Sequence, residues 1–271
     1  MINKQEKTNL LSQGVFIFVC LAVLTLLEFL VAVTFNSLVV LVVVALVKAG
    51  LVLYYYMHMS KLNENPDAAT DHESYAFKTG TNRAGLWLFL LSDAFVFGGL
   101  MAMRLNLLGL TRPDLNQNLG LFVTVVLLVS SFFMNRGETH LHNGNRAGFL
   151  KNTMITFILG LAFLLGVVMI EWHAIPSVAE AVLHLFGEPA GRTPLKPSSG
   201  VAGAAFFMMT GMHAFHVLTG LIFLAVIWVN GKRGLYDEKQ YPVEAAAVYW
   251  HFIDVVWIFF YPALYLIGTA I

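Results

Sequence analysis

The sequence predicts an all-α, polytopic membrane protein with seven transmembrane helices, arranged as a pair followed by a group of five. Of its 271 residues, 58% are hydrophobic and 12% are charged, whereas a soluble domain carries about 25% charged residues. The formal net charge is zero, which removes any electrostatic case for nucleic-acid binding. The single cysteine, Cys20, excludes an intrachain disulfide and a thiolate-rich metal site.

Seven uninterrupted apolar stretches come close to the length of about 20 residues that a helix needs to cross a bilayer. They lie at residues 11–35, 38–59, 84–105, 119–134, 149–172, 201–229 and 245–267. The fourth stretch is short, and we expect it to include residues 115–118 at its start. All of them are too long for the alternating strands of about 10 residues that build a membrane β-barrel.

Lys and Arg residues in the loops predict the orientation of the chain. With the N-terminus inside, the inner segments hold eleven of these residues and the outer segments hold four, while Lys48 lies within a span. Because inner loops carry an excess of positive charge, we expect the N-terminus inside and the C-terminus outside.

A polar stretch divides the chain into three parts. Residues 61–80 contain one proline and four acids, which is typical of a linker. The predicted parts are a transmembrane hairpin at residues 1–60, the linker at 61–80 and a five-helix domain at 81–271. In a second long loop, residues 178–186 have apolar side chains at helical spacing and predict a short helix on the outer membrane surface.

Asp93 is the clearest polar residue placed where lipid is expected. It lies about ten residues into the third span, or about 15 Å deep, and an ionisable group there costs about 2.5–3.5 kcal/mol. Its flanking residues offer no charged partner, so we expect the carboxyl group to be protonated for much of the time. Two roles are open: a group that exchanges protons or organises water, or a neutral acid that hydrogen-bonds a neighbouring helix.

The sixth span carries Thr210, His213 and His216. The two histidines are three residues apart, so they share one face of a helix. A metal would need further ligands at the same depth, and the paired His140 and His142 lie too far along the membrane normal. A structural polar network is therefore the favoured interpretation.

In the seventh span, His251 and Asp254 follow Glu244 by seven and ten residues, so the three side chains share one face of the helix. The sixth and seventh spans are antiparallel neighbours, so we expect Asp254 to meet His216 at a similar depth. Hydrogen bonds between helices explain these residues without any catalytic role.

In the N-terminal hairpin, Glu28 and Lys48 both fall in the outer half of the bilayer. An ion pair between the two helices is expected. The alternative for Lys48 is a side chain that extends to the membrane surface.

Two long motifs carry a resemblance to a known family. Residues 206–220 read FFMMTGMHAFHVLTG, and residues 243–257 read VEAAAVYWHFIDVVW. They resemble subunit III of the haem-copper oxidases, with its patterns F-x-x-T-G-x-H-x-x-H-V-x-x-G and V-E-x-x-x-x-Y-W-H-F-V-D-x-V-W. Every polar position is matched, and Ile253 replaces a valine. The resemblance covers approximately residues 81–271.

Other positions agree with this family. Arg83 is similar to its N-terminal arginine, and Asp93 follows Ser92 where the family commonly has glutamate, so the acid is one methylene shorter. Arg146 resembles the arginine of an inner-loop element, although that element's acid is absent here, and Glu171 matches an acid that ends a helix. The resemblance implies lipid or interface contacts for a set of five residues, namely Arg83, Arg146, Glu171, Trp250 and Trp257.

The hairpin resembles a different protein. Residues 47–59 read VKAGLVLYYYMHM, which is similar to the K-A-x-L-V-x-x-x-F-M-H-L pattern of the small bacterial oxidase subunit IV and includes Lys48 and His58. The chain is thus similar to a five-helix subunit III with a subunit IV-like hairpin fused ahead of it. This resemblance implies a multi-pass protein of the bacterial inner membrane.

The resemblance also implies a function. The chain would hold no catalytic residue, haem or copper, and would bind phospholipid, stabilise catalytic subunit I beside subunit II and support proton uptake through Asp93. Cytochrome c would donate electrons to the complex. Subunit III of a quinol oxidase and an accessory subunit of a nitric oxide reductase are alternatives. A proton-coupled transporter is disfavoured because the sequence has no internal repeat.

Overall fold

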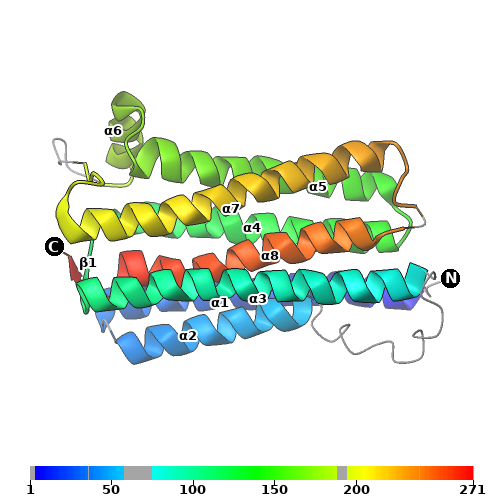
Figure 1. Cartoon of the computed structure of the whole chain (residues 1–271), viewed down its shortest axis with the longest axis horizontal. Helices are drawn as coiled ribbons and strands as arrows, with labels where there is room; N and C mark the ends of the chain where they lie inside the picture. Colours follow the sequence, from blue (N-terminus) through cyan, green and yellow to red (C-terminus); the bar gives the residue numbers. More distant parts are fainter. Residues whose placement is uncertain (1–3, 36, 58–74, 188–193, 238, 271) are drawn as a thin grey trace.

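The computed structural model describes residues 4–35, 37–57, 75–187, 194–237 and 239–270. In this part of the chain, seven helices are long and apolar enough to cross a membrane, which confirms the predicted fold class. The helices run along one long axis, and the two ends of the chain lie at opposite ends of the molecule (Figure 1). We call these the N-terminal end and the C-terminal end of the bundle.

Several of the helices continue into a short π-helical turn, and two short strands close the C-terminal end. In chain order the elements are α1 (Lys4–Thr34), α2 (Leu38–Leu51), η1 (Val52–Tyr56), α3 (Tyr75–Leu108), β1 (Thr111–Arg112), α4 (Gln117–His142), α5 (Arg146–Leu165), η4 (Gly166–Glu171), α6 (Pro176–Leu185), α7 (Gly200–Lys232), α8 (Tyr241–Tyr261), η5 (Pro262–Leu266) and β2 (Thr269–Ala270). Pro262 opens η5, where the missing N–H prevents the regular α-helical hydrogen bond.

Two of the observed helices change the predicted division of the chain. Helix α3 begins at Tyr75, so residues 75–80 of the predicted linker are helical, while residues 61–74 lie outside the described ranges. Helix α4 is 26 residues long, which is enough to span a bilayer. Of the expected extension at residues 115–118 only residues 117–118 are helical, because the Asn116 side chain caps the N-terminus, and most of the added length lies at residues 135–142. The predicted surface helix is α6, which projects from the C-terminal end of the bundle (Figure 1).

Helix α8 is the centre of the molecule. In its most apolar window 78% of the residues are buried, compared with 11% in α3. Two glycines on neighbouring helices make room for the Trp250 indole. A Cβ on Gly160 would lie 2.4 Å from this ring, and one on Gly220 would lie 3.0 Å away. The close approach of α5 and α7 to α8 therefore depends on these two positions.

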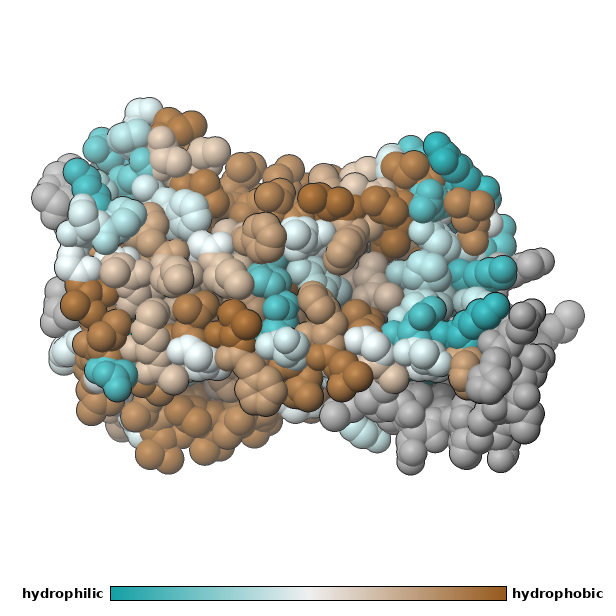
Figure 2. Space-filling model, viewed as in Figure 1, coloured by the Kyte–Doolittle hydropathy of each residue, from teal (hydrophilic) through white to brown (hydrophobic). Residues whose placement is uncertain are grey.

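The hairpin, formed by α1, α2 and η1, packs on the five-helix bundle formed by α3, α4, α5, α7 and α8. Helix α1 contacts α4, and α2 contacts α8. Hydrophobic side chains cover most of the middle of the face seen in Figure 2, around a small hydrophilic patch, and hydrophilic residues gather toward its two ends. This distribution is what a bilayer requires of a spanning protein.

The C-terminal end is closed by a pairing that the sequence did not indicate. Strands β1 and β2 run parallel, and Gly268 adopts a φ of +83° where a Cβ would lie 1.8 Å from the Leu110 carbonyl oxygen. The buried Arg104 donates hydrogen bonds to the carbonyl oxygens of Thr111, at 2.7 Å, and Ile267, at 3.5 Å. These contacts tie the end of α3 to the segment that follows α8.

Candidate functional site

The acid Asp93 of α3 pairs with His216 of α7. The distance between Asp93 Oδ2 and His216 Nε2 is 2.9 Å, and the side chains are 15% and 7% exposed. The Phe97 ring packs edge-on against the imidazole, with 4.8 Å between ring centroids. The pair therefore lies at the margin of the bundle, where most of its surface is covered by protein and a small part is exposed beside α3.

The hydrogen bonds of His216 define how this pair can carry a proton. Nδ1 lies 2.8 Å from the Met212 carbonyl oxygen, and because a carbonyl only accepts, Nδ1 must donate. The proton between Nε2 and Asp93 Oδ2 is then held either by the imidazole or by the carboxyl group. These two arrangements have the same net charge and both keep the hydrogen bond, so the proton can move within the pair without loss of the contact.

The predicted contact between His216 and Asp254 is wrong. His216 faces α3 and binds Asp93, whereas Asp254 faces the hairpin, where it lines a cavity with residues of α1 and α2. The prediction that Asp93 has no partner holds only for its sequence neighbours, since its partner comes from another helix.

His213 does not share its surroundings with His216. Its imidazole lies among aromatic rings, with centroids 5.0 Å from Trp257 and 5.7 Å from Phe163. Neither ring nitrogen has a hydrogen-bond partner among the described residues. Within the same ranges, no three His, Cys, Asp or Glu side chains lie close enough together to hold a metal ion.

Helix α8 is bonded to α4 through hydroxyl groups that sequence reasoning missed. The three contacts are Trp250 Nε1 to Ser130 Oγ at 3.1 Å, His251 Nδ1 with Ser131 Oγ at 2.8 Å and Trp257 Nε1 to Thr124 Oγ1 at 2.9 Å. Thr124 and Ser131 lie seven residues apart on one face of α4, and that spacing is the signal that could have revealed them, whereas Ser130 lies about 100° further around the helix.

These contacts correct the expected roles of two tryptophans. Trp250 and Trp257 are 0% and 2% exposed, so they do not contact lipid or another subunit. Their indole N–H groups are satisfied inside the chain, which is the usual condition for burying tryptophan.

The remaining members of the predicted network are bonded separately to different helices. Thr210 accepts a hydrogen bond from Trp172 Nε1 at 3.1 Å. Glu244 binds Arg83 through two hydrogen bonds of 3.0 Å each, which joins α8 to α3. The bonded partners of the predicted network residues lie on several different elements: α3 for His216 and Glu244, α4 for His251, and the residue after η4 for Thr210.

The predicted lipid or interface residues are largely engaged within the chain. Arg83 is bound to Glu244, and Arg146 donates to the carbonyl oxygens of Gly231, at 2.7 Å, and Lys232, where α7 ends. Glu171 lies at the end of η4 and is buried. The arginines therefore hold helix ends together, a role that short-range sequence patterns do not reveal.

In the hairpin, Glu28 and Lys48 form the expected ion pair between α1 and α2. Both side chains are buried, and the Oε1 atom of Glu28 has no hydrogen-bond partner among the described residues. His58, which we predicted to belong to the same motif, lies outside the described residues.

Comparisons with known proteins agree with both motifs. The family model described as "Cytochrome c oxidase subunit III" matches residues 191–269, and the one described as "Prokaryotic Cytochrome C oxidase subunit IV" matches residues 15–64. Cytochrome c oxidase subunit 3 of Thermostichus vulcanus is 33% identical over 191 residues, which span 68% of this chain and 86% of the relative.

Subunits of quinol oxidases are similar to this chain at a comparable level of sequence identity. Cytochrome bo(3) ubiquinol oxidase subunit 3 of Pseudomonas aeruginosa is 30% identical over 73% of this chain and 91% of its own length. Quinol oxidase subunit 3 of Bacillus subtilis is 30% identical over 76% and 96%. A chain of seven membrane-spanning helices with these motifs falls into the class of haem-copper oxidase membrane subunits. It belongs to the subunit III family.

Proposed function

We propose that this chain is subunit III of a proton-pumping terminal oxidase in a bacterial inner membrane. The observation that carries the proposal is the 33% identity to a cytochrome c oxidase subunit 3 over 86% of that relative's length. The chain is inserted with its N-terminus inside and serves to stabilise catalytic subunit I beside subunit II. The hairpin then takes the place of a separate subunit IV.

Haem and copper are proposed to belong to the partner subunits. The chain has a single cysteine, whereas the dinuclear copper site of the oxidase family needs a pair. The test is to purify the complex with and without this chain and to measure haem and copper per catalytic subunit. Equal content in both preparations is expected, and a loss that follows the chain would contradict the proposal.

Phospholipid binding is supported by an apolar groove between α3 and α8. The groove has a volume of about 290 Å³ and is lined by apolar residues such as Phe97, Met101 and Phe259. A groove of this chemistry, open to the bilayer, suits an acyl chain. Native mass spectrometry of the complex should then retain phospholipid on this chain, and its absence would argue against the assignment.

Asp93 is proposed to support proton uptake by the complex from the inner side. The support is the geometry of its pair with His216, in which one hydrogen bond of 2.9 Å holds a proton that can lie on either group. In Asp93→Asn, the amide can still bond to His216, so assembly and haem content should stay near wild type while turnover changes its dependence on pH. Turnover with the wild-type pH profile would contradict a proton role.

Cytochrome c is the electron donor that we propose for the complex. A quinol is the second candidate, favoured by the relatives from Pseudomonas aeruginosa and Bacillus subtilis. Steady-state assays of the purified complex with each reduced donor separate the two. If neither donor supports oxygen consumption by the complex, the terminal-oxidase proposal itself is contradicted.

A further inference from the structure

Asp254 is a buried acid that the contacts described so far do not explain. Its side chain is 5% exposed, and neither carboxyl oxygen has a hydrogen-bond partner among the described residues. Its neighbours on α8, in contrast, bond to hydroxyls of α4. Because a buried polar group without a partner is unfavourable, the position of Asp254 calls for a ligand.

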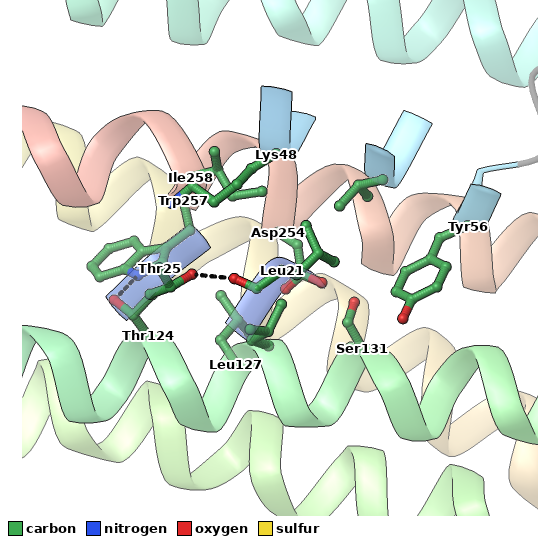
Figure 3. Close-up of a pocket in the computed structure, with 12 residues that line it drawn as sticks. Leu21, Thr25, Lys48, Tyr56, Thr124, Leu127, Ser131, Asp254, Trp257 and Ile258 are labelled. Carbon is green, nitrogen blue, oxygen red and sulfur yellow. Dashed lines mark hydrogen bonds between the residues drawn. The ribbon is translucent and has the colours of Figure 1, made fainter. Parts of the chain in front are cut away.

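A small cavity lies against Asp254, between the hairpin and the five-helix bundle (Figure 3). Its volume is about 20 Å³, and about 10–15 Å³ is sufficient for one water molecule. Both parts of the chain line it: Leu21, Thr25, Lys48, Val52 and Tyr56 from the hairpin, and Thr124, Leu127, Leu128, Ser131, Asp254, Trp257 and Ile258 from the bundle.

Polar groups on both sides of this cavity have unused hydrogen-bonding capacity. Ser131 Oγ bonds to His251 Nδ1, and a hydroxyl has one donor and two acceptor positions, so a second bond is available. Lys48 carries three N–H donors, and its ion pair with Glu28 engages one of them. A buried water typically makes two to four hydrogen bonds, and Asp254, Ser131 and Lys48 supply that number.

We propose that this cavity is a binding site for one water molecule, which bridges Asp254 of the bundle to the hairpin. The water donates to the Asp254 carboxyl group and accepts from the Lys48 ammonium group. A monovalent cation fits less well, because it needs more oxygen ligands than the cavity offers and the Lys48 charge would repel it. The site fixes where the hairpin docks, and it does not depend on which electron donor the complex uses.

The direct test is a high-resolution map of the intact complex. The expected result is density for one water within hydrogen-bond distance of an Asp254 carboxyl oxygen and of Ser131 Oγ or Lys48 Nζ. A carboxyl group surrounded only by apolar atoms, with no density in the cavity, would overturn the proposal. Density with the short distances of a coordinated ion would overturn it as well.

A matched pair of substitutions tests the same site in solution. Val52→Ile adds a methylene to the cavity wall and displaces the water, whereas Val44→Ile makes the same change on α2 away from the cavity. Val52→Ile should lower the thermal midpoint of the complex more than Val44→Ile does. In an Asp254→Leu background this difference should disappear, and its persistence would contradict a water bound by Asp254.

Infrared spectroscopy keeps the proposal falsifiable if Asp254→Leu fails to assemble. The carboxyl band of Asp254, assigned from the difference between wild type and Asp254→Asn, should shift in Val52→Ile and not in Val44→Ile. An identical band in all three Asp254-containing proteins would mean that no water bonds to this group.

Discussion

Helices α3 and α8 are held in the molecule by different means. Helix α8 is enclosed by its neighbours, and its indoles fill space between glycines. Helix α3 is largely uncovered and is attached by ionisable side chains at three heights: Arg83, Asp93 and Arg104. Arg83 and Arg104 are about 31 Å apart along the helix. The difference shows that close packing holds the interior, while polar contacts fix the position of a helix that has few packing partners.

The largest effect is expected from removing volume at the centre. Trp250→Ala leaves a cavity between α5, α7 and α8 and frees the Ser130 hydroxyl, so it should destabilise the chain by about 3–5 kcal/mol. The measurement is the thermal midpoint of the complex together with the amount of this chain that it retains. Phe95→Ala on α3 is the control, since Phe95 is 74% exposed. Equal losses in the two variants would show that α8 is not the packing centre.

A smaller effect is expected from breaking the contact between α3 and α8. Arg83→Gln removes the guanidinium donors, and Glu244→Gln replaces one of the two acceptor oxygens by an NH2 group, so each breaks the bidentate charged contact, with an expected cost of about 1.5–3 kcal/mol. The loss should be local, so hydrogen exchange should rise in the first turns of α3 and stay unchanged in α8.

The double variant provides the control for this pair. Because Arg83 and Glu244 bind each other, combining the two substitutions should cost less than the sum of the single costs. Strict additivity would mean that the bidentate contact contributes nothing to the attachment of α3.

The smallest effect is expected at the middle contact of α3. Asp93→Leu removes the hydrogen bond to His216 and should cost about 0.6–2 kcal/mol, the range of hydrogen bonds between membrane helices. Asp93→Asn keeps a bond and should cost less. The measurement is the amount of this chain that the complex retains. If Asp93→Leu and Asp93→Asn both lower it as much as Trp250→Ala does, the expected order of effects is wrong.

Depth along the membrane could be predicted from the sequence, whereas the direction in which a side chain points could not. Counting residues placed Glu28 and Lys48 at a common height, and the ion pair forms. The same counting placed His216 level with Asp254, yet His216 turns to α3. Three residues along a helix leave about 60° between two side chains, which is enough to direct His213 and His216 toward different neighbours.

The buried hydroxyls and the tryptophans show a second limit. Ser130 and Ser131 are small polar residues within an apolar run, and nothing local indicates that indole and imidazole groups of α8 will reach them. The family resemblance predicts lipid or interface contacts for Trp250 and Trp257, yet both are buried. Their burial follows from space left by glycines on other helices, which is a property of the tertiary structure.

The central place of α8 has a consequence for how this protein is made. Ribosomes deliver helices to the membrane in chain order, and α8 follows all six of the other spanning helices. Until it enters, Thr124, Ser130 and Ser131 of α4 have no indole or imidazole of α8 to bind. The spanning helices that precede α8 must therefore stay in an open arrangement, and the core of this bundle closes only when α8 inserts.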